Sequence, residues 1–528
     1  MIRESYTIAG GNYRNAGLAS SLLKTRLKKI GVDPAVLRRV MIAAYEAEMN
    51  VVIHADRGTM DVTFGDSYLD MEIRDEGPGI SDITQAMKEG YSTAPEAARE
   101  MGFGAGMGLP NIRKNSDFFR IESSVGKGTY IRATIRLNTH KGTAGHGNSL
   151  VVREGVCSGC LACVRACPMG AIRVHEKRPE ILRHRCVDCT TCMGVCESGA
   201  ITLKSRSFFP VKAERGVLLV PTELLAQFGA AHPPQYVFRV LEKSGFSDVF
   251  TTAGCEVALR RAVAERSVHK EVKKPVISPV CPAVVNLIET RFPSLISLLA
   301  PYLSPLEALI SRTSARPLLC VAACPSQFTL FRSMYDECEA IVVSPSETCA
   351  VMREQELRPV EIGHLHAENG CLEEKDSFLE SSQKSLIVSG MNEVVDILER
   401  TENGLVEDVE ILETYACSYG CAGSPLYREN PALAGHRADR FSMGNAQPKV
   451  AVKRGEPYRA REGMRLHPNL AEAIVLLSKI DTVMGSLPGK DCGMCGAPDC
   501  AALAEDIVLG RAAESDCVQP REKGDEGQ

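Results

Sequence analysis

The sequence predicts a multidomain protein of mixed α/β class, and three observations support this. The chain has 528 residues, which is too long for one hydrophobic core. All 21 cysteines lie after residue 140, so the opening quarter differs in composition from the rest. Strand-like alternation and helical periodicity occur in residues 1–140, and short apolar runs typical of buried strands occur at 216–220 and 340–343 within a long α/β stretch at about 210–445. The chain is therefore expected to divide into several units, most of them combining helices with strands.

Composition disfavours several classes of function. The net charge is -5 and the pI is near 6.2, so there is no basic surface of the kind that binds nucleic acid. No apolar run approaches the roughly 20 residues that a membrane helix needs, and the first residues do not resemble a signal peptide. Without export, disulfides are not expected. We therefore expect the cysteines to bind metal in the reducing cytoplasm of an anaerobe.

A long helix is predicted in the cysteine-free region. Asp33 is a good N-cap and Pro34 suits the first helical position, and apolar residues at helical spacing continue to about His54. Glu46 and Asn50 lie four residues apart in this helix and so share one face.

The same region predicts two half-buried strands and glycine-rich turns. Apolar and charged residues alternate over 69–74, and this strand leads into Asp-Glu-Gly-Pro-Gly at 75–79. The run Gly-Phe-Gly-Ala-Gly-Met-Gly follows at 102–108. A second alternating strand begins at Thr129, directly after Gly-Lys-Gly.

These four motifs, in this order, resemble the histidine-kinase-like (GHKL) ATPases with the Bergerat fold, specifically anti-sigma factors and switch serine kinases. The resemblance covers about 1–138 and implies an α/β sandwich that binds ATP and Mg²⁺. It implies that Asn50 binds magnesium, that Glu46 is the catalytic base and that Asp75 accepts a hydrogen bond from adenine. The remaining nucleotide contacts that it implies come from Gly77, Gly79, Gly104, Gly106, Gly108 and Thr129.

Each of these motifs has an ordinary interpretation when it occurs alone. A Glu-x3-Asn pair is most often a solvated helix face, a glycine run is most often a loop, and His54 is interpreted as a helix-end residue. The ordered set favours nucleotide binding. Phosphotransfer is a separate question, because such domains can sequester a partner without turnover. The segment from about Ser81 to Gly106 is expected to act as a mobile lid.

Two tandem cysteine runs follow a glycine-rich linker predicted at 141–149. The spacing C-x2-C-x2-C-x3-C occurs twice within 150–207, which resembles the two-cluster bacterial ferredoxins, a small α+β module. In that family the fourth cysteine of each run serves the other cluster. The two expected [4Fe-4S] sets are therefore Cys157, Cys160, Cys163 with Cys196, and Cys186, Cys189, Cys192 with Cys167.

Three further cysteine segments occur in an α/β region expected at 208–445. Their order, together with the preceding ferredoxin pattern, resembles the active-site signatures of the iron-only hydrogenase large subunit over about 150–440. The resemblance implies a cubane cluster held by Cys281, Cys324, Cys417 and Cys421.

The sequence departs from the hydrogenase family at positions that the family uses for catalysis. Val280 stands where the family has a proton-relaying cysteine, and valine has no ionisable group. Gln327 stands where the family has a lysine that hydrogen-bonds a diiron cyanide, and glutamine carries no charge. These departures disfavour hydrogen chemistry and a diiron subsite.

A fourth set of cysteines lies near the end of the chain. After a connecting segment at 446–480, the region 481–520 resembles a small helical four-cysteine cluster domain, with zinc as the alternative to a [4Fe-4S] cluster. Gly493 and Gly496 are expected to let the backbone wrap closely around the metal core, and residues 521–528 form a charged tail. The ligands expected here are Cys492, Cys495, Cys500 and Cys517. The other cysteines are expected to be small buried hydrophobes: Cys255, Cys320, Cys338, Cys349 and Cys371.

Taken together, the motifs predict an iron–sulfur protein with three to four [4Fe-4S] clusters that senses redox state or a gas. Its ATP-binding region would act as a serine kinase or as an anti-sigma-type partner switch, and the resemblance implies a STAS-type antagonist or a sigma factor as partner, with redox proteins and a possible homodimer. The alternative is a hydrogenase-like oxidoreductase with a regulatory ATPase-like domain. A plain electron carrier would leave the first domain unexplained.

Overall fold

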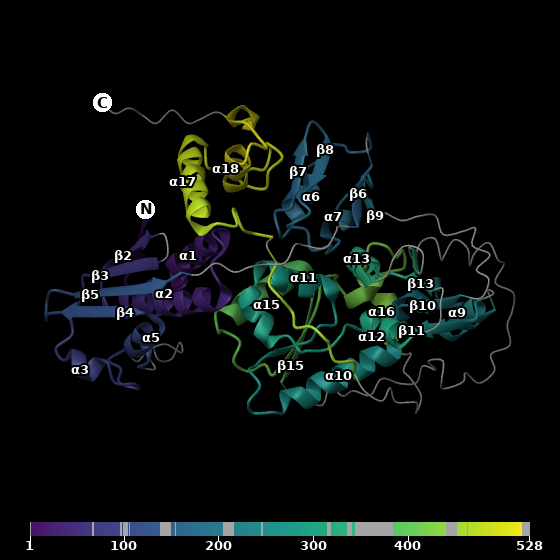
Figure 1. Cartoon of the computed structure of the whole chain (residues 1–528), viewed down its shortest axis with the longest axis horizontal. Helices are drawn as coiled ribbons and strands as arrows, with labels where there is room; N and C mark the ends of the chain where they lie inside the picture. The colour runs from purple at the N-terminus through teal and green to yellow at the C-terminus, as the bar shows by residue number, and fades with distance from the viewer. Residues whose placement is uncertain are drawn as a thin grey trace.

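The computed structural model shows a multidomain α/β protein, as the sequence predicts (Figure 1). It describes residues 2–65, 68–95, 98, 104, 106–137, 149–153, 155–203, 216–243, 246–313, 318–334, 340–343, 384–439, 451–461 and 463–519. The linker expected at 141–149, except Ser149, and the tail at 521–528 lie outside the described residues, as do Cys338, Cys349 and Cys371. Among the described residues, no helix combines the length and apolar character needed to cross a membrane.

The amino-terminal unit (2–137) is a five-stranded antiparallel sheet with helices packed on it. The strand order is β1-β2-β3-β5-β4, and α2 contacts four of these strands as well as α1 and α5. The elements are β1 (Ile2–Ala9), η1 (Tyr13–Asn15), α1 (Leu18–Lys29), α2 (Pro34–His54), β2 (Arg57–Phe64), β3 (Tyr68–Asp75), α3 (Ile83–Ala86), α5 (Gly108–Asn115), β4 (Phe118–Ser123) and β5 (Thr129–Arg136).

The local signals of this unit are confirmed. Asp33 caps α2, because its carboxylate accepts a hydrogen bond from the Ala35 amide at 2.9 Å, and Pro34 opens the helix. The two alternating strands pair directly as β3 and β5, with Ile73 opposite Ile131. Their apolar faces are buried in one core, so the alternation marks the side that packs against the helices.

The ferredoxin-like unit (149–203) repeats the same small motif twice. In each half a short helix carries the third cysteine of the run, and the residue before it has a left-handed conformation, Leu161 with φ 60° and Thr190 with φ 70°. The two halves share a pair of two-stranded antiparallel sheets. The elements are β6 (Leu150–Val152), α6 (Ala162–Ala166), β7 (Ile172–His175), β8 (Arg178–Ile181), α7 (Thr191–Gly194) and β9 (Ile201–Leu203).

The middle unit (216–461) contains two parallel sheets, ordered β11-β10-β13-β14 and β12-β16-β15. Its strand elements are β10 (Val217–Val220), β11 (Asp248–Thr251), β12 (Val276–Ile277), β13 (Leu318–Val321), β14 (Ala340–Val343), β15 (Ser385–Ser389) and β16 (Ile411–Tyr415). Its helices are α8 (Thr222–Leu225), η2 (Ala226–Phe228), α9 (Pro234–Glu242), α10 (Ala253–Ser267), α11 (Pro282–Arg291), η3 (Pro293–Leu298), α12 (Pro305–Arg312), α13 (Pro325–Met334), α15 (Met391–Glu402), η5 (Gly420–Gly423) and α16 (Pro431–Asp439).

The tail unit (463–519) returns to the start of the chain. It consists of α17 (Leu470–Ser486), α18 (Cys500–Val508) and η6 (Glu514–Asp516), and α17 crosses position 480, where the sequence analysis ends the connecting segment. Leu477 and Ile480 are buried in the same core as Leu23 and Leu27 of α1. Figure 1 shows the yellow-green α17 beside the purple α1. The amino-terminal unit is therefore completed by a helix more than 400 residues away in the sequence.

This packing predicts that Leu477→Ala destabilises the amino-terminal unit. Leu477 is fully buried, so its truncation removes apolar contacts and leaves a cavity at a cost of about 2–5 kcal/mol. The matched control is Val475→Ala, because Val475 lies on the same helix and is 54% exposed. We expect faster hydrogen exchange in α1 and α2 and a lower melting temperature for Leu477→Ala only. Equal behaviour of the two variants would show that α17 is not part of this core.

Candidate functional site

A large cavity of about 1570 Å³ lies against α2 in the amino-terminal unit. It is lined by Glu46 and Asn50 on the helix and by Asp75 at the end of β3. The structure thus brings together residues from separate motifs. Of the other predicted nucleotide contacts, those that also line the cavity are Gly79, Gly104, Gly106, Gly108 and Thr129. Gly77, which the structure also describes, lies outside the lining.

The carboxylate of Asp75 is held in place by two backbone amides. Its Oδ1 accepts hydrogen bonds from the Gly77 amide at 2.9 Å and the Thr129 amide at 3.1 Å. Its Oδ2 makes no hydrogen bond to any described residue, so it can accept one from a ligand. Gly128, which the sequence analysis did not single out, allows this arrangement: a Cβ there would lie 2.0 Å from the Asp75 carbonyl oxygen.

The amino end of α5 closely approaches Asn50. A Cβ on Gly108 would lie 2.9 Å from Asn50 Oδ1, so glycine allows the helix end to reach this side chain. No described side chain caps α5, which leaves its first backbone amides available for an anion. The buried Nδ2 of Asn50 has no hydrogen-bond partner in the described structure. Such an unpaired group is costly unless a ligand or water satisfies it.

The sequence analysis did not identify two residues that the structure shows to position predicted site residues or the helices around them. Asn111 on α5 donates from Nδ2 to Glu46 Oε1 at 2.6 Å and so fixes the orientation of that carboxylate. Glu48 is buried and caps the amino end of α1 by accepting hydrogen bonds from the amides of Ala19 and Ser20. Glu48 follows Glu46 by two residues, and a helix places such residues on different faces. The position of Glu48 on a different helix face from Glu46 was the sequence signal that could have indicated a separate role for it.

The ferredoxin-like unit gathers its cysteines in two groups. The four thiols of the second expected set, Cys167, Cys186, Cys189 and Cys192, line one small cavity. In the first set, burial raises the pKa of the Cys163 thiol to about 11, and the nearby thiols of Cys157, Cys160 and Cys196 act in the same direction. A metal that binds such a thiol displaces its proton.

The four cysteines of the middle unit also line one cavity, together with Cys189 and Thr190 of the ferredoxin-like unit: Cys281, Cys324, Cys417 and Cys421. Thr190 Oγ1 lies 3.5 Å from Cys417 Sγ, so the two cysteine sites adjoin. Burial raises the pKa of the Cys417 thiol to about 12. Gln327 lines this cavity, but its Oε1 accepts a hydrogen bond from the Ala323 amide at 2.8 Å.

In the tail unit, Cys492 and Cys517 lie near Cys495 and contribute to the raised pKa of its thiol, for which burial is the main cause. Cys500 begins α18, and its amide donates to Asp491 Oδ1 at 2.8 Å. Gly496 has φ 84°, and a Cβ there would lie 1.8 Å from the Val174 carbonyl oxygen. The tail loop therefore docks directly on β7.

Hydrogen bonds to the cysteine sulfurs fit iron–sulfur clusters. Backbone amides of Gly159, Ala171 and Gln327 donate to these sulfurs at 3.3–3.5 Å, and hydrogen bonds of this kind help to set the reduction potential of a bound cluster. Within the described part of the chain, no three His, Cys, Asp or Glu side chains are placed to hold one single metal ion. Cys255 and Cys320 are instead buried in an apolar core, as expected for small hydrophobes.

Comparison with protein families supports this division of the chain. Residues 12–135 match the histidine kinase-like ATPase domain, and residues 156–200 match the 4Fe-4S dicluster domain. Residues 219–312 match the C-terminal domain of the iron only hydrogenase large subunit, and residues 487–519 match a putative Fe-S cluster family. The sequence predicted all four resemblances. These matches support the binding of iron–sulfur clusters and of a nucleotide.

Individual relatives match the amino-terminal unit. The serine/threonine-protein kinase RsbT of Bacillus subtilis (strain 168) is 30% identical over 119 residues, which are 22% of this chain and 84% of the relative. An anti-sigma F factor of Caldanaerobacter subterraneus is 33% identical over 110 residues, 20% of this chain and 73% of the relative. The solved structure of the [FeFe]-hydrogenase HydA(deltaEFG) aligns at 13% identity with a TM-score of 0.36, covering 55% of this chain and 96% of that one.

The middle cysteine site predicts a clear difference between two substitutions. Cys421→Ser is expected to lose about four iron atoms per chain from anaerobically reconstituted protein, because it removes a ligand of a cubane. Cys320→Ser is the control, since Cys320 is fully buried in an apolar core outside the cavity. Iron analysis and EPR spectroscopy measure both. Retention of all the iron together with an EPR spectrum identical to that of the parent protein would show that Cys421 is not a cluster ligand.

Proposed function

We propose that this protein is an iron–sulfur regulatory protein. Through its histidine kinase-like ATPase domain, the chain belongs to the family of RsbT-type serine/threonine kinases and anti-sigma F factors. The redox state of its clusters would control the phosphorylation or sequestration of a partner protein. One observation carries this proposal. Helix α18 of the tail unit contacts both the ferredoxin-like unit and α1 of the ATPase domain through largely buried charges.

The ATPase domain supplies the groups that the chemistry needs. Asp75 Oδ2 is free to accept from the adenine amino group, and Asn50 Oδ1 would hold Mg²⁺. The amides at the start of α5 would bind the phosphates of ATP, which supplies the phosphoryl group to be transferred. Glu46, oriented by Asn111, would accept the proton of the attacking hydroxyl.

The cysteines would hold four [4Fe-4S] clusters, which store and pass electrons when bound. The residue sets are those of the sequence analysis, two in the ferredoxin-like unit, one in the middle unit and one in the tail. Cys189 lines both the second ferredoxin cavity and the middle cavity, which supports electron passage between them. The contact of Gly496 with β7, where its carbonyl oxygen accepts from the Val174 amide at 3.0 Å, brings the tail site to the same unit.

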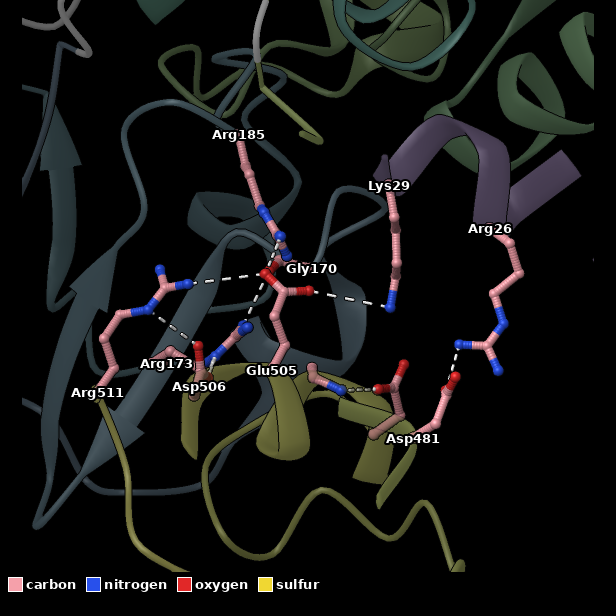
Figure 2. A network of polar contacts seen from close by, with 11 residues as sticks. Arg26, Lys29, Gly170, Arg173, Arg185, Asp481, Glu505, Asp506 and Arg511 are labelled. Atoms are coloured by element: carbon pink, nitrogen blue, oxygen red, sulfur yellow. Dashed lines mark hydrogen bonds and ion pairs between the residues drawn. The ribbon is translucent and has the colours of Figure 1, made fainter. Parts of the chain in front are cut away.

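Figure 2 shows the contacts that would couple the clusters to the ATPase domain. Arg173 and Arg185 of the ferredoxin-like unit pair with Asp506 and Glu505 of α18, and all four side chains are buried. The second carboxylate oxygen of Glu505 lies 3.9 Å from Lys29 Nζ on α1. We call this set of residues the α18 ionic cluster.

The α18 ionic cluster suits the transmission of charge. Buried ions must stay paired, because an uncompensated buried charge costs about 3–5 kcal/mol. An electron added to a cluster in the ferredoxin-like or tail unit would change the local field and therefore the preferred positions of these side chains. Coupling free energies between sites are typically about 1–3 kcal/mol, which would be enough to change nucleotide or partner affinity severalfold.

The partner would be a protein of a partner-switching system. It would be a STAS-type antagonist that offers a serine or threonine hydroxyl, or a sigma factor that is sequestered; the likeness to a serine/threonine-protein kinase and to anti-sigma F factors supports a protein partner of this kind. Redox proteins would deliver electrons to the ferredoxin-like unit, and the ATPase domain would be able to form a homodimer.

A hydrogenase-like oxidoreductase is the weaker alternative. The Gln327 side chain carries no positive charge for a cyanide ligand, unlike the lysine found at this position in the family. Val280 is packed in the apolar core of the middle unit, where it cannot relay a proton. The middle site would therefore sense electrons rather than turn over hydrogen.

Redox control predicts that phosphate transfer from radiolabelled ATP to a STAS-type partner differs between oxidised and reduced protein. Glu46→Gln is expected to lower transfer about 10²–10⁴-fold at both potentials, because it removes the base. Glu505→Gln is expected to fold with reduced stability and to lose the dependence on potential. Its control is Glu472→Gln, since the Glu472 side chain is 65% exposed on α17.

Two results of this experiment would count against the proposal. Equal labelling of the partner at both potentials in the parent protein would remove the sensor function and leave a kinase. Redox dependence that survives in Glu505→Gln would show that the signal does not pass through the α18 ionic cluster.

A further inference from the structure

The large cavity has a second wall, and this wall comes from the middle unit. Residues 273–275, 401–407 and three side chains of η3 line the same space as Glu46 and Asn50. Sites for small molecules usually occupy about 300–1,000 Å³, and this cavity exceeds that range. The expected nucleotide site of the ATPase domain is therefore bounded by a second domain of this chain, which lies outside the region that the relatives match.

Buried ion pairs fix this wall against the ATPase domain. Glu402 Oε2 lies 2.6 Å from Lys24 Nζ and 3.0 Å from Lys28 Nζ, and the Glu402 side chain is 4% exposed. Lys24 also donates to Asn403 Oδ1 at 2.8 Å. Lys24, Glu402 and Asn403 themselves line the cavity. The two walls are thus joined at the cavity edge and hold a defined separation.

Some charged side chains of the second wall are in ion pairs and others are not. Glu402 is neutralised by the two lysines of α1, and Lys274 pairs with Glu410 at 3.1 Å. Lys273 and Glu407 are exposed and form no ion pair with any residue that the structure describes. Among the charged side chains of this wall, these two are the ones without an oppositely charged partner among the described residues.

We propose that the nucleotide site is composite, with Lys273 attracting and Glu407 repelling the phosphate chain of a nucleotide bound on the opposite wall. This inference rests on the proposed function, since it assumes that the cavity binds ATP. The ligand class is a nucleoside triphosphate, whose charge distinguishes it from adenosine. Affinity for the phosphates would therefore depend on a domain that carries a cysteine site.

The second wall lies at one end of the strands that carry the middle cysteines. Lys273 precedes β12, which leads to Cys281, and Glu407 precedes β16, which leads to Cys417. The two strands pair in parallel, so their amino ends face the cavity and their carboxyl ends reach the cysteine site. At about 3.3 Å per residue, the five residues of β16 span roughly 16 Å. A short, rigid sheet thus separates the nucleotide from the expected cluster.

The test measures ATP and adenosine affinity of the full-length, reconstituted protein by calorimetry under anaerobic conditions. Lys273→Gln is expected to weaken ATP binding about three- to tenfold, and Glu407→Gln to strengthen it about two- to fivefold, both less at high salt. Adenosine affinity is expected to stay unchanged in both variants. Lys270→Gln is the matched control, because Lys270 is an exposed lysine on the same loop that does not line the cavity.

Asp75→Asn separates this inference from the proposed function. The composite site alone would be overturned if Asp75→Asn bound neither ATP nor adenosine while Lys273→Gln and Glu407→Gln kept the ATP affinity of the parent protein. Unchanged ATP affinity in Asp75→Asn would instead overturn the nucleotide site itself. Equal losses of ATP affinity in Lys273→Gln and Lys270→Gln would show a general effect of surface charge and would also overturn the composite site.

Discussion

Burial of two positive and two negative side chains between β7, the loop after β8 and helix α18 is the constraint on which the arrangement of the units depends. Arg173, Arg185, Glu505 and Asp506 are each almost fully inaccessible to solvent. Desolvation of such groups is compensated only when partners stay in contact, so the ferredoxin-like and tail units are held in one relative position. Because Glu505 also reaches Lys29, the same constraint extends to the ATPase domain.

The path of the chain makes this constraint effective. Helix α17 completes the core of the amino-terminal unit, and α18 follows it closely, so the last part of the chain lies between the first helix and the ferredoxin-like unit (Figure 1). Within the ATPase domain, Glu48 joins α1 to the helix that carries Glu46 and Asn50. A continuous series of contacts therefore leads from the cysteine sites to the nucleotide cavity.

Local chemistry was predictable from the sequence, whereas the contacts between units were not. Cysteine spacing, the Asp33 cap and the alternation before Asp75 are short-range signals that act within one or two elements, and the structure forms the helix and strands they predict. No local signal marks Glu505 and Asp506 as buried, because their burial depends on distant partners such as Arg173 and Arg185. The apolar residues of α17, such as Leu477 and Ile480, are likewise buried because they pack in the same core as α1. The departure of Gln327 from the hydrogenase pattern was visible in the sequence, but its bond to the Ala323 amide required the structure.

The central claim is that reduction of the clusters changes the ATPase domain through α18 and α1. Hydrogen exchange of backbone amides in the oxidised and the dithionite-reduced protein tests this most directly. The account predicts that exchange changes in α18, in α1 and at the amino end of α2, with little change in the outer strand β4. Identical exchange of α1 in the two redox states, in protein shown by EPR spectroscopy to be reduced, would contradict it.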